Sequence, residues 1–329
     1  MSVSSRPRAA FYCVSSGVYF LGAVGLINSL RLQGHAEPIF LLDCGLTASQ
    51  RELLSPHVTL VPAPADAPPY LLKTFAPMRH PAAVMVLIDV DMIVTRPLTE
   101  LIERASRGQV LAVENQMDRF VPEWGDLLDL GPIRRQPYLS SGLVLLGGSV
   151  GEAVLRLMDD RQRQVEYELG YLARNVPDYP FLYLDQDVLN AILATRLEAD
   201  RLVALDSRLA PVPPFAGLRI TNEEALSCSY EDGVEPYVVH QYLPLKPWLE
   251  AVYDGAYSRL LRRSLAGPDV AVRVPRPQIP LRMRTGPLAY AERRLINARE
   301  QLRWRLGGLV RQLGARVETR RRRGAVERL

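Results

Sequence analysis

Two carboxylates, Asp89 and Asp91, stand directly after an uninterrupted apolar run at residues 84–88. Such a run is typical of a buried strand in a mostly parallel sheet. Residues i and i+2 of a strand face the same side, so we expect both carboxylates to point into the crevice at the strand's end. Buried carboxylates need a cation or strong donors, and the simplest occupant is a hard divalent cation that carries phosphates. Paired Asp residues also occur in turns and helix caps, and the pair alone leaves that alternative open.

A histidine and a lysine later in the chain form a second candidate group. His240 ends a strand-like run, and Lys246 follows it closely, before a Pro-Trp pair. An imidazole is a good third metal ligand beside two carboxylates, and an ammonium suits a diphosphate as a compact positive charge. The chain has 38 Arg and only 2 Lys, which singles out Lys246 and Lys73. A lone histidine would more often be a hydrogen-bonded structural residue.

Two polar segments in the middle of the chain add further candidates. The first begins a predicted helix and carries Asp185, Gln186, Asp187 and Asn190. Clustered carboxylates and amides can orient sugar hydroxyls, although Asp185 alone could simply cap the helix. The second, Ser140-Ser141-Gly142, opens a predicted strand with small residues that let a ligand approach closely. Neighbouring loops supply three candidates for contact with an acceptor, which are Trp124, Arg134 and Arg135.

The elements that position these residues alternate between strand and helix. This alternation predicts an α/β fold with a mostly parallel, doubly wound sheet. The predicted strands are residues 11–15, 38–42, 58–61, 85–88, 110–113 and 142–146, and the predicted helices are residues 19–32, 47–54, 98–105, 152–172 and 185–193. Thr47 is the expected N-cap of its helix. The chain divides into two halves of one domain, residues 1–115 and 116–265, and an extension, residues 266–329.

The composition is that of a globular protein with a basic tail. The 329 residues are 48% hydrophobic and 23% charged. No apolar run approaches the roughly 20 residues that span a bilayer. The N-terminus shows no secretory signal pattern, and the three cysteines are far apart, so we expect a cytoplasmic protein with reduced thiols. Residues 270–329 hold 16 Arg and 4 Glu, whereas the rest of the chain is net acidic.

The tail pattern predicts an amphipathic helix over residues 288–316. One face carries Leu288, Leu295, Leu302 and Leu309 together with Ala291, Ala298 and Leu313, and arginines occupy most of the rest. Such a helix suits an anionic membrane surface, although it could instead pack on the body or dimerise. Nucleic acid is not an expected partner, because the basic residues are confined to the tail and lack interleaved aromatics apart from Trp304.

In their order along the chain, these motifs resemble those of family 8 glycosyltransferases, the group that includes glycogenin and bacterial lipopolysaccharide galactosyl- and glucosyltransferases. Asp89-Val90-Asp91 is similar to the family's Asp-x-Asp, and Ser140-Ser141-Gly142 to its Asn-Ala/Ser-Gly. Residues 185–190 are similar to its Asp-Gln-Asp-x-Leu-Asn, residues 240–248 to its His-x5-Lys-Pro-Trp, and residues 14–23 to its nucleotide-binding turn. The resemblance covers roughly residues 9–250. The sequence departs from the family at Gly17, Ser140 and Leu243, which favours an unusual donor or acceptor.

The resemblance implies a GT-A type, Rossmann-like sheet with a C-terminal helical extension. It also implies a retaining transferase that moves a hexose from a UDP-sugar to a glycan, lipid-linked or small-molecule acceptor. The first half would bind the nucleotide sugar and the second half the acceptor. Asp89, Asp91 and His240 would hold Mn²⁺ or Mg²⁺. The expected nucleotide- and donor-binding residues are Ser15, Ser16, Tyr19, Lys73, Asp89, Val90, Ser140, Ser141, Gly142 and Asp187.

The expected catalytic residues are Gln186, Asp185 and Lys246. Lys246 would stabilise charge on the departing UDP. Gln186 stands where the family places a group near the reacting carbon, and because a glutamine is a poor nucleophile, we favour departure and attack on one face with the leaving phosphate as base. Two-carboxylate retention is the competing scheme, with Asp187 as the nearest alternative nucleophile. Asp187 is better suited to support Lys73 or the helix start.

Two other functions remain open. One is a catalytically silent nucleotide-sugar-binding protein, which turnover would separate from an enzyme. The other is a nucleotidyltransferase, which would need a Gly-rich basic first loop that residues 14–23 lack. If the tail binds lipid, the protein would lie on the inner face of the membrane.

Overall fold

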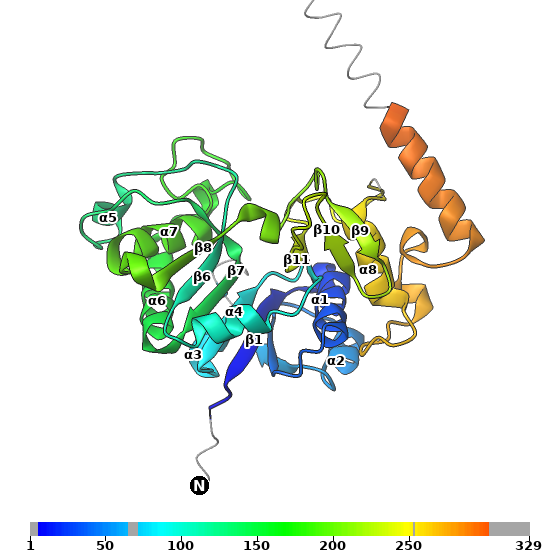
Figure 1. Ribbon diagram of the computed structural model, residues 1–329, viewed down its shortest axis with the longest axis horizontal. Helices are drawn as coiled ribbons and strands as arrows, with labels where there is room; N and C mark the ends of the chain where they lie inside the picture. The colour runs from blue at the N-terminus through cyan, green and yellow to red at the C-terminus, as the bar shows by residue number, and fades with distance from the viewer. Residues whose placement is uncertain (1–5, 65–71, 253, 303–329) are drawn as a thin grey trace, which may run out of the picture.

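The computed structural model describes residues 6–64, 72–252 and 254–302. Its centre is a seven-stranded sheet in the order β3-β2-β1-β4-β7-β6-β8 (Figure 1). The pairs β1–β2, β2–β3, β1–β4 and β6–β8 are parallel, whereas β7 runs antiparallel to β4 and β6. The sheet is therefore mostly parallel, as predicted. Its strands are β1 (Ala9–Ser15), β2 (Ile39–Asp43), β3 (Thr59–Pro62), β4 (Val84–Ile88), β6 (Val110–Glu114), β7 (Leu139–Gly147) and β8 (Leu202–Leu205).

Both faces of the central strands are buried, which explains why β1, β4 and β6 are apolar without alternation. In β4, Val86 and Ile88 enter one core cluster, and Met85 and Leu87 enter the other. Residues of α1, α4 and α8 pack in the first cluster, and residues of α3, α6 and α7 pack in the second. The helices are α1 (Phe20–Leu32), α2 (Ala48–Leu54), α3 (Phe75–Arg79), α4 (Thr99–Ala105), α5 (Trp124–Leu127), α6 (Gly148–Arg161), α7 (Asp185–Arg196) and α8 (Ala256–Ala266).

A separate two-stranded pairing continues from the end of β4. The turn at residues 89–91 leads into β5 (Met92–Val94), which pairs antiparallel with β11 (Val238–His240). The register sets His240 opposite Met92. Strand β11, from late in the sequence, therefore places His240 beside the end of β4. Strands β9 (Arg219–Asn222) and β10 (Ser227–Ser229) form a small antiparallel hairpin.

Most of the predicted elements are confirmed, but one predicted helix is wrong in its extent. Thr47 caps α2 with a reciprocal capping box, as expected. The helix predicted over residues 152–172 ends at Arg161 and is followed by two short 3₁₀ turns. Beyond the helix, the backbone N–H of Glu166 donates to the hydroxyl of Tyr179 at 2.7 Å. This N–H group therefore bonds to a side chain and not to a backbone carbonyl of the helix. Helix α8 was not predicted from the sequence.

The C-terminal extension contains a helix whose described part covers residues 287–302 (Figure 1). It packs on the body through Ala289 and Ile296, which are buried, and Asn297 Oδ1 accepts a bond of 2.9 Å from the backbone N–H of Asp254. Leu288 and Leu295 are 75% and 73% exposed. The face of the leucine repeat is therefore not the face that contacts the body. Leu309, Leu313 and Trp304 lie outside the described residues.

Membrane-spanning helices are absent from the described part of the chain, where no helix combines the required length and apolar character.

A buried asparagine in α1 ties the helix to α8 and to the segment after it. Asn28 donates to the carbonyls of Ser264 and Val272 at 2.8 and 2.9 Å, and its Oδ1 accepts from the N–H of Val272 at 2.7 Å. The Asn28→Leu substitution would leave these buried backbone groups without partners. We expect it to lower the free energy of unfolding by on the order of 3 kcal/mol in urea titrations. Gln33→Leu, just past the end of the same helix, loses one surface bond and should cost less than about 1 kcal/mol. Equal losses for the two variants would contradict this interpretation.

Candidate active site

The turn between β4 and β5 carries the two carboxylates that the sequence singles out. Asp89 and Asp91 lie in this turn and not within a strand, so the i, i+2 argument for a shared face was wrong in its geometry. The turn closes with a bond of 3.2 Å from Met92 N–H to the carbonyl of Asp89, and Asp89 N–H donates to the carbonyl of Gly142 at 2.9 Å. Both carboxylates still face His240, because β11 pairs with β5 immediately after the turn.

Asp89, Asp91 and His240 form a compact cluster of potential metal ligands. One ligand atom from each lies within 4.8 Å of the others. His240 Nε2 lies 3.1 Å from Asp91 Oδ1 and 3.8 Å from Asp89 Oδ2. Asp91 Oδ1 is buried and makes no well-aligned hydrogen bond with the described residues, although His240 Nε2 lies 3.1 Å away. A buried oxygen in this state, facing an imidazole nitrogen and a second carboxylate, fits a hard divalent cation such as Mn²⁺ or Mg²⁺.

Two lysines pair with the carboxylates of this cluster. Lys246 Nζ lies 2.6 Å from Asp91 Oδ2 and also donates to the carbonyl of Gln241. Lys73 Nζ lies 2.8 Å from Asp89 Oδ1 and 3.0 Å from Asp185 Oδ2. Both lysines of this arginine-rich chain therefore serve one site.

The electrostatics of the two carboxylates differ. Burial opposes ionisation of Asp91, but His240 and Lys246 outweigh it and hold the pKa of Asp91 well below its usual range. Burial, with repulsion from Asp91, keeps the pKa of Asp89 raised despite Lys73. Burial alone would lower the pKa of Lys73, and the adjacent carboxylates of Asp185 and Asp89 raise it instead. Added positive charge between the carboxylates would relieve their mutual repulsion.

The Ser140-Ser141-Gly142 segment begins β7 and lies beside the same cluster. Lys73 Nζ donates to Ser141 at 3.3 Å, through both its carbonyl and its hydroxyl. Gly142 N–H donates to the hydroxyl of Ser140 at 3.2 Å. A Cβ on residue 142 would lie 2.8 Å from His240 Cε1 and 3.2 Å from Asp89 Oδ2. Only a glycine leaves the carboxylate and the imidazole in their positions.

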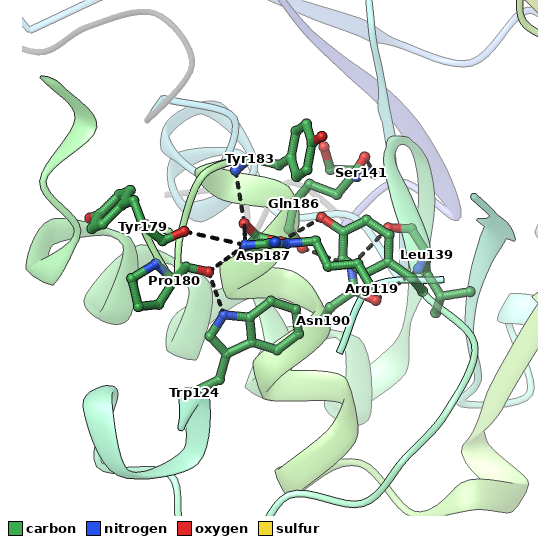
Figure 2. A network of polar contacts seen from close by, with 11 residues as sticks. Arg119, Trp124, Leu139, Ser141, Tyr179, Pro180, Tyr183, Gln186, Asp187 and Asn190 are labelled. Atoms are coloured by element: carbon green, nitrogen blue, oxygen red, sulfur yellow. Dashed lines mark hydrogen bonds and ion pairs between the residues drawn. The ribbon is translucent and has the colours of Figure 1, made fainter. Parts of the chain in front are cut away.

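The start of α7 supplies the polar residues of the motif at residues 185–190. Asp185 is not a helix cap, because Leu184 is the N-cap residue and Asp185 pairs with Lys73. Gln186 Oε1 accepts a bond of 3.2 Å from the N–H of Ser141 (Figure 2). Asn190 exchanges two hydrogen bonds of 2.8 Å with the backbone of Leu139. These bonds join α7 to β7 at the cluster.

Asp187 is fully buried and serves the helix start. It accepts a bond of 2.8 Å from the backbone N–H of Tyr183 and forms an ion pair with Arg119 (Figure 2). It also accepts a bond of 2.5 Å from the hydroxyl of Tyr138. The carboxylate partners of Lys73 in the described part of the chain are Asp89 and Asp185. Of the two predicted roles for Asp187, the support of the helix start agrees with these contacts.

The residues expected at the nucleotide surround the end of β1. Ser15 is buried, Ser16 is half-buried, and Tyr19 makes an edge contact with Trp248 at 6.2 Å between ring centroids. Lys246 Nζ lies 5.7 Å from the centre of the Tyr19 ring. Burial, followed by the charges of Asp91 and Asp89, raises the pKa of Tyr19.

The Val90 side chain is buried in the core, and its carbonyl lies close to α1. A Cβ on Gly22 would come within 2.8 Å of both the Val90 carbonyl and the Trp248 ring. The glycine in α1 thus allows the turn that carries the two carboxylates to pack closely against the helix.

Sequence reasoning misplaced two acceptor-side candidates and missed two site residues. Trp124 is 2% exposed and donates to the carbonyl of Pro180 at 2.7 Å, so it packs the loop. Arg134 donates to the carbonyls of Leu193 and Leu197 at the end of α7. Arg135 is exposed and pairs with Asp118. The missed residues, Arg119 and Tyr138, stand outside the recognised motifs, although Tyr138 is only two positions before Ser140.

The close packing at residue 142 makes the Gly142→Ala substitution a test of the ligand cluster. We expect Mn²⁺ affinity, measured by calorimetry, to fall by about tenfold or more, because the added methyl displaces His240 or Asp89. Gly25→Ala is the matched control, since its Cβ would meet Leu261 at 2.4 Å in the core and not the carboxylates. That variant should lose stability and keep its Mn²⁺ affinity. Unchanged affinity in the folded Gly142→Ala protein would contradict the proposed ligand set.

No protein-family model and no curated protein sequence matches this chain. Solved structures match it over most of its length. The galactosyltransferase LgtC, solved with donor and acceptor sugar analogues, has a TM-score of 0.53 at 13% identity, covering 82% of this chain and 98% of LgtC. An active-site mutant of LgtC has a TM-score of 0.50 at 14% identity with the same coverage. The bifunctional glycosyltransferase WbbM has a TM-score of 0.52 at 14% identity, covering 82% of this chain and 51% of WbbM. This chain therefore has the GT-A, family 8 glycosyltransferase-like fold that its motifs predict.

Proposed function

We propose that the protein is a metal-dependent, retaining glycosyltransferase that moves a hexose from a UDP-sugar to a glycan, lipid-linked or small-molecule acceptor. The observation that carries the proposal is the convergence of Asp89, Asp91 and His240 with both lysines of the chain at one site. This convergence occurs on a fold shared with glycosyltransferases. Ligands for a cation, and positive charge beside them, are what the departure of a nucleoside diphosphate needs.

Asp89, Asp91 and His240 would hold Mn²⁺ or Mg²⁺. When bound, the ion supplies a Lewis acid beside the diphosphate. Lys246 adds a buried positive charge next to Asp91. Because its ammonium is fixed by Asp91 before any ligand arrives, it requires little reorganisation as negative charge develops on the leaving group. Ser15, Ser16 and Tyr19 would contact the nucleotide on the far side of Lys246.

The donor sugar would lie between Lys73 and the start of α7. Lys73 orients Asp185, and Ser141 orients the carbonyl oxygen of Gln186. A carboxylate and an amide oxygen in fixed positions can accept hydrogen bonds from sugar hydroxyls. Gln186 would face the reacting carbon and stabilise the positive charge that develops on it, without forming a covalent bond. The acceptor would then attack on the same face of the sugar from which the diphosphate departs. The leaving phosphate takes the acceptor's proton. The pairing of Asp187 with Arg119 weighs against Asp187 as a nucleophile.

The tail supports a location on the cytoplasmic face of a membrane. Its described helix exposes Leu288 and Leu295 on one face and carries arginines such as Arg294 and Arg299. Exposed leucines beside arginines suit the interface of an anionic bilayer. A transferase held there would reach acceptors anchored in lipid.

The Asp91→Asn variant tests the enzymatic proposal. We expect metal-dependent release of UDP from one member of a panel of UDP-sugars, and a loss of about 100-fold or more in the variant, because a metal ligand and the partner of Lys246 change together. Asp232→Asn at the surface, which pairs with Arg208, is the matched control and should keep its activity. Release that survives both chelation and the Asp91→Asn change would contradict metal dependence. Binding of UDP without turnover of any donor would favour a silent binding protein.

The membrane proposal predicts sedimentation of the full chain with phosphatidylglycerol vesicles and not with phosphatidylcholine vesicles. Leu288→Glu combined with Leu295→Glu should weaken binding by about tenfold or more, since each leucine loses roughly 1.5–3 kcal/mol of apolar transfer. Leu127→Glu on α5, where the leucine is 51% exposed, is the control and should bind normally. A change from dimer to monomer in the tail variant, with no vesicle binding by the unmodified protein, would instead identify a dimerisation helix.

A further inference from the structure

The turn that carries Lys246 is fastened by the C-terminal extension. No helix or strand runs through the described residues between β11 and α8. The carbonyl of Lys246 accepts hydrogen bonds of 2.9 Å from the N–H groups of Leu249 and Glu250, and these bonds close the turn. The next carbonyl, that of Pro247, accepts a bond of 2.8 Å from Arg282 Nε. The backbone beside the buried lysine is therefore held by a residue that stands 35 positions after Pro247 in the chain.

Arg282 is itself held in a fixed place, although it lies outside the motifs recognised in the sequence. It belongs to a short 3₁₀ turn, Leu281–Met283, and the side chain of Met283 is 2% exposed in the core. This buried neighbour fixes the backbone from which Arg282 reaches Pro247. Burial lowers the pKa of Arg282, so its guanidinium is partly withdrawn from water. A charged donor in such a place forms a stronger bond to a carbonyl than it would at the surface.

The helix of the extension contacts the same short turn. Arg293, on this helix, donates through Nη1 to the carbonyls of Arg282 and Arg284, at 3.1 and 2.9 Å. Arg293 Nε also lies 3.4 Å from Asp254 Oδ2, so the helix is joined to the segment before α8 as well. A continuous series of contacts thus leads from the helix, through Arg293 and Arg282, to the carbonyl of Pro247.

We propose that Arg282 is a positioning residue that holds the Lys246 turn at the diphosphate site, and that the docked helix of the extension keeps Arg282 in place through Arg293. The proposal rests on the proposed function, because it takes Lys246 as the positive charge beside the leaving diphosphate. Without the bond from Arg282, the carbonyl of Pro247 is free to turn, and the ammonium of Lys246 is less firmly preorganised for a ligand. The extension is then part of the nucleotide site as well as a candidate membrane contact.

Calorimetric titration of the full chain with UDP and Mn²⁺ tests the effect on the site. Arg282→Met keeps an aliphatic side chain and removes the donor to Pro247, and we expect the dissociation constant for UDP to rise by about fivefold or more. Arg282→Lys keeps a charged donor and should restore the constant to within about twofold of the unmodified protein. Arg284→Met is the matched control, since Arg284 Nε donates to the carbonyl of Ile279 within the extension, and it should change the constant by less than about twofold.

A Lys246→Met background shows whether Arg282 acts through the lysine. There we expect Arg282→Met to change the dissociation constant for UDP by less than about twofold, because the charge that Arg282 positions is gone. An equal rise in the two backgrounds would overturn the proposal, and so would an unchanged constant in the single variant Arg282→Met.

Hydrogen exchange of the Leu249 and Glu250 amides, which close the turn, needs no nucleotide. We expect these amides to exchange about fivefold faster or more in Arg282→Met and in Arg293→Met, and at an unchanged rate in Arg284→Met. Arg262→Met is the control for the helix, because Arg262 also pairs with Asp254 but the bonds of Arg293 to the short turn are kept. Equal exchange rates in Arg293→Met and Arg262→Met would overturn the role of the helix.

The two measurements separate a failure of this inference from a failure of the proposed function. Unchanged exchange in Arg282→Met would overturn the inference whether or not the protein binds UDP. Faster exchange in a protein that binds no UDP would reject only the proposed function, since the hold on the Lys246 turn would still be present.

Discussion

The cost of removing several carboxylates from water at one place is the constraint on which this site depends. Asp89, Asp91 and Asp185 converge at the end of β4, and each would be costly to bury alone. The chain compensates them with its two lysines and with His240. An ammonium is compact and donates in several directions, which suits a crowded site where it must contact a carboxylate and a carbonyl together. This explains why an otherwise arginine-rich chain uses lysine here.

The fold places these charges by bringing together segments that are far apart in the sequence. Strand β11 pairs with β5 and delivers His240, and β7 enters the sheet antiparallel beside β4 and delivers Gly142. Helix α7 then joins β7 through Asn190. Because each link uses hydrogen bonds to the backbone of a buried strand, the ligands are fixed more firmly than side chains on free loops would be. Burial, with repulsion from Asp91, keeps the pKa of Asp89 raised, and a divalent cation between the two carboxylates would relieve this repulsion.

The sequence predicted six of the seven strands of the sheet, all but β8, and it singled out the charged residues that converge at the candidate site, for a physical reason. Strands buried on both faces must be apolar throughout, and a carboxylate that follows such a strand is conspicuous, as Asp89 is. The antiparallel course of β7 could not be predicted, because an apolar strand carries no mark of its direction. The true geometry of Asp89 and Asp91 was also missed, since a tight turn and a strand end can share one sequence. The contact of Arg119 with Asp187 could not be predicted either, because the two residues are distant in sequence and no local pattern indicates a long-range ion pair.

The most direct test of a cation-dependent nucleotide-sugar site is the affinity for UDP with and without Mn²⁺. Three ligands that lie within 4.8 Å of one another, beside two lysines, should bind the diphosphate strongly only when the cation neutralises the carboxylates. Calorimetric titration should give a dissociation constant for UDP at least about tenfold lower with Mn²⁺ than with a chelator, a coupling of about 1.4 kcal/mol. Equal affinity under the two conditions would contradict the assignment of Asp89, Asp91 and His240 as the site that joins metal and nucleotide.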